Sequence, residues 1–311
     1  MPSCPPQFLI VGTPRSGTTL IQRLATELDG VSVPPETHFF RLFAPDLLGR
    51  QELPLTGSAL TEELRRFSEL DDLQGAELDP ELTAARLGGT ANTVMGLFGG
   101  IVRALAGDAE LYGEKTPSHL RWWRELSAAN PELKLVAVVR DPRAVVASYL
   151  EAWGERPHSV IAERWAIDHR SLQAARAALG ARCLVLRYED VVSEPGLART
   201  ALSRFLGRPQ GAAPASDSET PLHLPWETWK ARSSGPVITA RIDGWRDTLP
   251  QKVVREISTI AADEMRAFGY PVDEPAIQLS ANDQLLRYRY RLARRVEQVR
   301  RRRLAQRPGF A

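Results

Sequence analysis

The sequence predicts an α/β domain in which a central parallel sheet carries helices on both faces. Short apolar runs over 7–11, 133–139 and 183–186 predict buried strands. Amphipathic stretches follow them, and strands that alternate with helices are typical of a parallel sheet. The length of 311 residues and the hydrophobic content of 43% fit one large globular domain and exclude a disordered or collagen-like chain.

The elements can be justified in chain order. The first strand ends at Gly12, and an apolar stripe predicts a helix over 18–28. A possible second strand over 31–33 stops at two prolines. The pattern weakens between 41 and 110, where helical pieces are predicted over 59–70 and 80–87 and a weakly specified helix over 88–100. Later helices are predicted over 142–153, 159–179, 195–206 and 251–268, with a Pro-, Ser- and Gly-rich loop over 208–236.

The net charge of +2 is unevenly distributed along the chain. The segment from Arg287 to Ala311 holds ten arginines and one glutamate, or +9, so residues 1–286 carry −7. The overall basic balance therefore says nothing about the folded body, and we expect no nucleic-acid partner. We expect a single domain over 1–284 and an Arg-rich helical tail over 285–311.

The tail combines its positive charge with an apolar seam. Leu285, Leu292 and Val299 recur every seven residues, with Tyr288 and Val296 between them. A solvated helix, an oligomer or partner-helix contact, and attraction to an anionic membrane all remain open. There are only two cysteines, and no signal peptide or membrane-spanning apolar run is visible. We therefore expect a cytoplasmic protein, with peripheral membrane contact as one option.

The turn after the first strand has the composition of a phosphate cradle. It reads Gly12-Thr13-Pro14-Arg15-Ser16-Gly17-Thr18-Thr19, and its glycines let backbone N–H groups approach an anion. The glycine spacing is that of the ATPase loop G-x-x-x-x-G-K-[ST], but Thr18 stands at the lysine position. Ordinary ATP or GTP hydrolysis is therefore not expected, and Arg15 is the cation of the loop.

A second anion site is predicted after residues 133–139. Arg140 lies at the carboxyl end of that strand, where α/β folds bind ligands, and Ser148 follows eight residues later on a helix. The guanidinium and the hydroxyl can converge on one anion. Two such sites on neighbouring strands suit a donor with two separated phosphates.

Both motifs resemble those of sulfotransferases that use 3′-phosphoadenosine 5′-phosphosulfate (PAPS). The resemblance implies a P-loop-like sulfotransferase fold, PAPS as donor, 3′,5′-diphosphoadenosine (PAP) as product and no metal. In that family, a basic residue before Ser-Gly-Thr-Thr serves the 5′-phosphosulfate, and Arg-Asp-Pro with a later Ser serves the 3′-phosphate. The residues implied here are Arg15, Ser16, Gly17, Thr18, Thr19, Arg140 and Ser148.

Two further segments resemble the carbohydrate and protein sulfotransferases. Pro35-Glu36-Thr37-His38-Phe39-Phe40 is similar to the Glu-x-His-Phe-Phe of the heparan-type enzymes, which implies Glu36 as general base, with His38 as the alternative. Glu114-Lys115-Thr116-Pro117 implies that Lys115 lies near the sulfuryl group and stabilises charge in the transition state.

Looser matches complete the resemblance. Arg187-Tyr188-Glu189-Asp190 implies a tyrosine near the nucleotide, and the stretch 238–246 implies Arg241 and Gly244 on the 3′-phosphate side, with Ser233 and Ser234 sharing in it. Residues 41–110 and 209–236 lie outside the motifs and are expected to be acceptor-side insertions. Their candidate pocket residues are His223, Trp226 and Trp229.

The expected reaction is in-line transfer of a sulfuryl group from PAPS to a hydroxyl. The acceptor stays open among a carbohydrate, a glycolipid, a peptide tyrosine and a small secondary metabolite. The alternatives are a nucleotide-dependent small-molecule kinase or NTPase of related fold, and a non-catalytic nucleotide-binding member.

Overall fold

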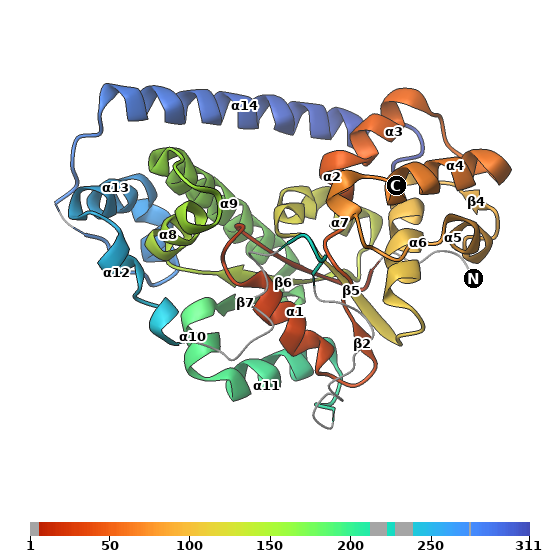
Figure 1. Ribbon diagram of the computed structural model, residues 1–311, viewed down its shortest axis with the longest axis horizontal. Helices are drawn as coiled ribbons and strands as arrows, with labels where there is room; N and C mark the ends of the chain where they lie inside the picture. The colour runs from red at the N-terminus through yellow and green to blue at the C-terminus, as the bar shows by residue number, and fades with distance from the viewer. Residues whose placement is uncertain (1–5, 212–222, 228–238, 274) are drawn as a thin grey trace.

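A five-stranded parallel sheet forms the centre of the computed structural model, which describes residues 6–211, 223–227, 239–273 and 275–311 (Figure 1). The strand order is β2-β5-β1-β6-β7, and every pairing is parallel. The strands are β1 (Phe8–Gly12), β2 (Val31–Ser32), β5 (Leu111–Lys115), β6 (Lys134–Val139) and β7 (Cys183–Arg187). The predicted α/β fold is confirmed, and β1 and β6, which lead into the two anion motifs, are neighbours.

Alternating residues of the central strands enter two separate cores. Phe8 and Ile10 face the layer of α1 (Thr18–Thr26), α10 (Tyr188–Ser193) and α11 (Pro195–Leu206). Leu9 and Val11 face the layer of α8 (Pro142–Trp153), α9 (His158–Leu179) and α13 (Gln251–Ala267). Because successive strand residues point to opposite faces, strands apolar throughout are buried on both sides.

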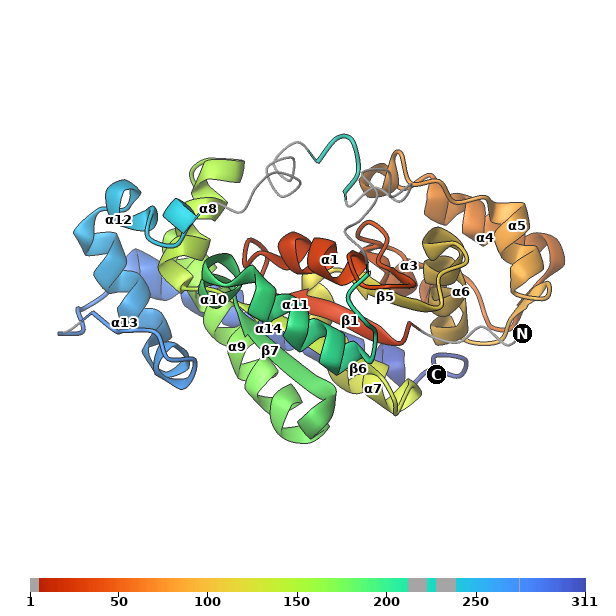
Figure 2. The same ribbon diagram turned by 90° about the horizontal axis from the view of Figure 1, so that it is seen from below.

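Residues 39–106 form a helical cap beside β5 (Figures 1 and 2). It contains α2 (Phe39–Leu42), α3 (Ala44–Arg50), α4 (Gly57–Ser68), η1 (Asp71–Leu73), α5 (Pro80–Arg86) and α6 (Val94–Ala106), with β3 (Leu55–Thr56) antiparallel to β4 (Thr90–Ala91). Phenylalanine rings pack at its centre, with Phe39 and Phe98 centroids 5.1 Å apart. The cap thus shares one core with the sheet.

The prediction of a helix over 88–100 is wrong for the first half of that range. Gly88 and Gly89 have φ of 68° and 73°, which turn the chain into β4. The helix begins only at Val94, where Thr93 caps it by accepting a hydrogen bond from the Gly96 N–H at 2.9 Å.

The other helices predicted between 18 and 268 lie within two residues of their expected bounds. The elements that complete the fold are η2 (Pro117–Trp122), α7 (Trp123–Ala129), η3 (Gly180–Arg182), η5 (Thr239–Arg241) and α12 (Trp245–Thr248). Of the predicted 208–236 loop, only 208–211 and 223–227 are described, and they contain no helix.

The C-terminal helix α14 (Ala281–Ala305) begins before the predicted tail and runs along the outside of α9 (Figure 1). Beyond it, Phe310 is 2% exposed and belongs to the main core. The Val94 and Met95 N–H groups donate to the carbonyls of Gly309 and Phe310 at 2.7 and 3.0 Å. Among the described helices, none has the length and apolar content needed to span a membrane.

Candidate active site

The loop between β1 and α1 is built to receive an anion. Gly17 has φ of 94° and precedes the first turn of α1, whose N–H groups lack partners within the helix. Arg15 also has a positive φ, 74°, and the Ser16 N–H donates to the Thr13 carbonyl at 3.1 Å. The Ser16 hydroxyl is buried and has no hydrogen-bond partner within the described part of the chain. A phosphate or sulfate oxygen would satisfy it.

Tyr188 packs tightly against this loop. A Cβ atom at Gly17 would lie 2.4 Å from Tyr188 Cδ2, so glycine is required there both for its conformation and for this contact. The Arg140 guanidinium lies over the Tyr188 ring, with its central carbon 4.3 Å from the ring centroid.

Arg140 links three segments of the site. Its guanidinium donates to the carbonyls of Arg15 and Arg241 at 3.1 and 2.8 Å. The side chain is buried, and burial lowers the pKa of Arg140 below the ordinary arginine value. In the described ranges, no carboxylate lies within ion-pair distance of it, and its buried Nε has no hydrogen-bond partner. An anion beside it would offset the cost of burying this charge.

Ser148 joins the same cluster from α8. Its hydroxyl accepts a hydrogen bond from Arg15 Nε at 3.1 Å, and the Arg15 guanidinium lies 5.4 Å from the Trp153 ring. The structure therefore brings Arg15, Arg140, Ser148, Tyr188 and Arg241 together. Gly244 lies further on, at the start of α12, and its carbonyl accepts a hydrogen bond from Thr248.

The end of β6 is held by side-chain contacts that were not predicted from the sequence. Asp141 caps α8 and binds Arg143 through both carboxylate oxygens, at 2.9 and 2.6 Å. The Asp141 N–H donates to Glu189, and the Trp165 indole donates to the Arg140 carbonyl, both at 2.9 Å. These contacts fix the backbone from which Arg140 projects.

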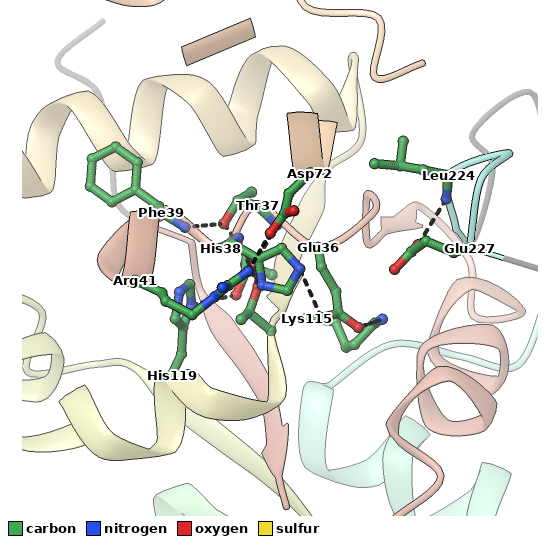
Figure 3. A network of polar contacts seen from close by, with 12 residues as sticks. Glu36, Thr37, His38, Phe39, Arg41, Asp72, Lys115, His119, Leu224 and Glu227 are labelled. Atoms are coloured by element: carbon green, nitrogen blue, oxygen red, sulfur yellow. Dashed lines mark hydrogen bonds and ion pairs between the residues drawn. The ribbon is translucent and has the colours of Figure 1, made fainter. Parts of the chain in front are cut away.

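Glu36 and Lys115 form a buried ion pair at the end of β5 (Figure 3). Lys115 Nζ lies 2.6 Å from Glu36 Oε1, and the two residues are 0% and 7% exposed. His38 Nε2 lies 3.5 Å from Glu36 Oε2. The structure thus brings together both candidate bases, Glu36 and His38, and Lys115, the candidate for stabilising charge in the transition state.

A second carboxylate, Glu114, anchors the segment that carries Glu36, because the Thr37 N–H donates to it. It accepts hydrogen bonds from the Thr37 hydroxyl at 2.9 Å and from His119 Nδ1 at 2.8 Å, and Thr116 also donates to it. Burial acts to raise the pKa of Glu114, but the His119 charge and these hydrogen bonds outweigh it and keep the pKa below the ordinary value. Glu114 is therefore an ionised anchor.

The anchoring role of Glu114 and His119 was not predicted from the sequence. Glu114 was visible only as the neighbour of Lys115, and no periodicity links it to His119. Their contact depends on the turn from β5 into η2, which was not predicted.

Backbone strain concentrates at the same place. Among the described residues, Arg15 and His38 are the only ones other than glycine with positive φ, 74° and 49°. Such conformations persist when the surrounding structure enforces them, and they cluster at functional sites.

Residues 223–227 bring a further buried acid into the view of Figure 3. Glu227 is 3% exposed and accepts a hydrogen bond from the Leu224 N–H at 2.9 Å. His223 Nδ1 contacts the Leu224 carbonyl at 3.1 Å, and Trp226 lies on the same segment. Trp229, Ser233 and Ser234 lie outside the described residues. In the ranges that are described, no three or more His, Cys, Asp or Glu side chains group as metal ligands.

Comparisons with known proteins agree with this geometry. A family model described as "Sulfotransferase family" matches residues 6–211. Carbohydrate sulfotransferase 3 of Tetronarce californica is 27% identical over 180 residues, or 48% of this chain and 38% of the relative. Carbohydrate sulfotransferase 7 of Mus musculus is 34% identical over 123 residues, or 36% of this chain and 24% of the relative. The matches thus span well under half of these relatives' length.

Two solved structures show the same fold. The sulfotransferase domain from the curacin biosynthetic pathway has a TM-score of 0.59 at 19% identity, covering 87% of this chain and 99% of that domain. The sulfotransferase domain from the Synechococcus PCC 7002 olefin synthase has a TM-score of 0.58 at 24% identity, covering 87% and 96%. With the family match over the loop, β5, β6 and α8, these findings establish that the chain belongs to the sulfotransferase family.

Proposed function

We propose that this protein transfers the sulfuryl group of PAPS to a hydroxyl of an acceptor. The observation that carries the proposal is the pair of anion-binding sites on neighbouring strands. One is the loop after β1, and the other is formed by Arg140 and Ser148 after β6. The family implies PAPS as donor and PAP as product, and the unsatisfied Ser16 hydroxyl and Arg140 Nε fit two phosphate groups.

Glu36 is proposed as the general base. Its pairing with Lys115 favours the carboxylate form, which is the form able to accept a proton. The acceptor oxygen forms a bond to sulfur, the bond from sulfur to the 5′-phosphate oxygen breaks, and the hydroxyl proton moves to Glu36. The products are a sulfate ester and PAP. His38 is the alternative base because it lies beside the same carboxylate.

Arg15 and Lys115 are proposed to stabilise the charge that develops during transfer. Both are cations held in place before the reaction, Lys115 by Glu36 and Arg15 by Ser148, so little reorganisation is needed. The loop N–H groups at Ser16 to Thr19 are proposed to hold the 5′-phosphosulfate, and Tyr188, Arg241 and Gly244 to lie toward the nucleotide.

A carbohydrate hydroxyl is the acceptor that we would test first. Both relatives described above are named carbohydrate sulfotransferases, and their matched regions are 27% and 34% identical to this chain. A glycolipid, a peptide tyrosine and a small secondary metabolite remain the other acceptors to assay.

The donor is tested by thermal unfolding with PAP, and with ATP and Mg²⁺ in parallel. At about 100 times Kd, a ligand adds about 2.7 kcal/mol to the free energy of unfolding. We expect PAP to stabilise the protein and Ser148→Ala, which removes one hydroxyl, to weaken this effect. Thr200→Ala, at an exposed position of α11, is the control. If ATP with Mg²⁺ stabilises the protein and PAP does not, the kinase or NTPase alternative is favoured.

Sulfuryl transfer itself is tested with labelled PAPS and a panel of the four acceptor classes. PAP binding without transfer to any of them would favour the non-catalytic nucleotide-binding member.

A further inference from the structure

Helix α14 is held to the body by its charged side. The guanidiniums of Arg287 and Arg291 contact the Glu163 carboxylate at 2.8 and 3.1 Å, and Arg301 contacts Glu125 at 3.1 Å. Glu163 is 3% exposed, and Arg301 also lies over the Trp122 ring. These contacts fix which side of α14 faces α9 and which side faces outward.

The outward side carries the apolar seam. Leu285, Tyr288, Leu292, Val296 and Val299 are 46–63% exposed, and they make up five of the seven large hydrophobic side chains exposed within the described part of the chain. Their spacing places them along one face of a helix about 37 Å long, at 1.5 Å per residue. An exposed apolar stripe of this kind marks an interaction surface.

Exposed arginines border the seam. At 3.6 residues per turn, Arg289 and Arg300 fall on one side of it and Arg295 and Arg302 on the other, with Arg303 at its C-terminal end. The acidic residues of α14 are Asp283 and Glu297, and both fall on the inward half of the helix. Glu297 pairs there with Arg294.

The charge pattern selects the partner. A second copy of α14 would bring arginines against arginines, so self-association through this face is disfavoured. A bilayer with anionic lipids offers both complements, since its acyl boundary accepts the seam and its headgroups attract the arginines. We propose that α14 lies in the interface of an anionic membrane, with its seam inserted and its flanking arginines on lipid phosphates.

Figures 1 and 2 show that the fold permits this contact. Helix α14 lies beyond α9 on one side of the sheet, whereas α1 and α11 cover the other. The whole length of α14 is thus presented at the outside of the molecule. The proposal does not depend on the transfer reaction, so its test needs no activity measurement.

The test is cosedimentation of the full chain with vesicles. One set is phosphatidylcholine alone, and the other also contains phosphatidylserine. We expect binding only to the second set, weakened by salt. Leu292→Ser with Val296→Ser should lower the partition coefficient by about tenfold or more, because less apolar surface is inserted. Leu82→Ser with Leu197→Ser is the matched control, since these side chains are 51% and 65% exposed elsewhere.

The remaining outcomes overturn the proposal. Absence of binding, equal binding to both vesicle sets, or unchanged binding of the seam variant would each do so. A dimer by light scattering that the seam variant turns into a monomer would assign the face to a second copy. Retention on an immobilised acidic polypeptide without vesicle binding would assign it to an acidic protein. Circular dichroism melting of each variant shows that it is folded.

Discussion

Glu36, in its buried ion pair with Lys115, is the proposed base, and a substitution that changes one atom of its carboxylate tests this role. Glu36→Gln keeps the shape of the side chain but cannot take a proton, so transfer should fall by about 10²- to 10⁴-fold. PAP binding should persist, because the contacts proposed for the nucleotide come from Arg140 and the loop and not from Glu36. The measurements are initial rates with labelled PAPS and calorimetric PAP titration.

His38→Asn is the comparison that separates the two candidate bases. His38 lies 3.5 Å from Glu36 and adopts φ of 49°, a conformation that asparagine also tolerates. If Glu36 is the base, His38→Asn should reduce the rate much less than Glu36→Gln. The reverse order of effects would make His38 the base.

Another residue-scale prediction concerns His169, which is stacked on Trp165 with ring centroids 3.6 Å apart. Burial lowers the pKa of His169 to about 4, from an ordinary value of 6.5. Between these values the unfolded chain binds the extra proton, so the free energy of unfolding falls as the pH falls from 6.5 to about 4. The loss reaches about 3 kcal/mol at most.

Urea denaturation across this pH range measures the effect. His169→Gln should flatten the pH dependence of the unfolding free energy, and Thr200→Ala, at an exposed side chain that does not titrate, should leave it unchanged. An unchanged slope in His169→Gln would contradict the assignment.

At the scale of elements, helices with local start and stop signals could be predicted from the sequence. Proline at the start of α8 and of α11, and Gly207 after α11, fixed the bounds of those helices. Strand β5 escaped prediction because Tyr112, Gly113, Glu114 and Lys115 have little apolar character. It is a strand because it lies between β1 and β2, where Gly113 accommodates the Phe8 ring. Tertiary packing, not propensity, decides such an element.

Gly17, in the loop before α1, can be tested against Gly207, a second glycine with positive φ. Gly17→Ala should cost about 1–2 kcal/mol for its left-handed backbone, plus the displacement of Tyr188 from the new Cβ. Gly207 also has a positive φ, 71°, but open space around it, so Gly207→Ala isolates the backbone cost. We expect weaker PAP binding in Gly17→Ala alone, measured by calorimetry. Equal PAP affinity in both variants would argue against a role for the loop and Tyr188 in binding.

For the whole molecule, the sequence correctly predicted that the two anion motifs lie on adjacent strands. It did not predict how the chain ends. The many arginines after residue 286 led to the expectation of a tail distinct from the domain. Yet these arginines pair with carboxylates on distant segments, such as the buried Glu163 and the partly buried Glu125. Contacts over more than a hundred residues leave no local pattern, so neither they nor the burial of Phe310 could be foreseen.

Phe310 provides the whole-molecule test of this arrangement. Its ring stacks on Trp122 at 6.1 Å and packs near Phe40, and through the aromatic cluster it joins the last turn of the chain to the cap that carries Phe39. Phe310→Ala should lower the free energy of unfolding by about 3–5 kcal/mol, the usual cost of emptying a buried aromatic site. The unfolding of the cap and the sheet should shift together, because they share one core.

Urea denaturation followed by tryptophan fluorescence and by far-UV circular dichroism measures the loss of stability and whether the two transitions coincide. Arg303→Ala, on the exposed side of α14, is the control. A loss below about 1 kcal/mol, within the range of surface substitutions, would mean that the C-terminal segment contributes little to the core.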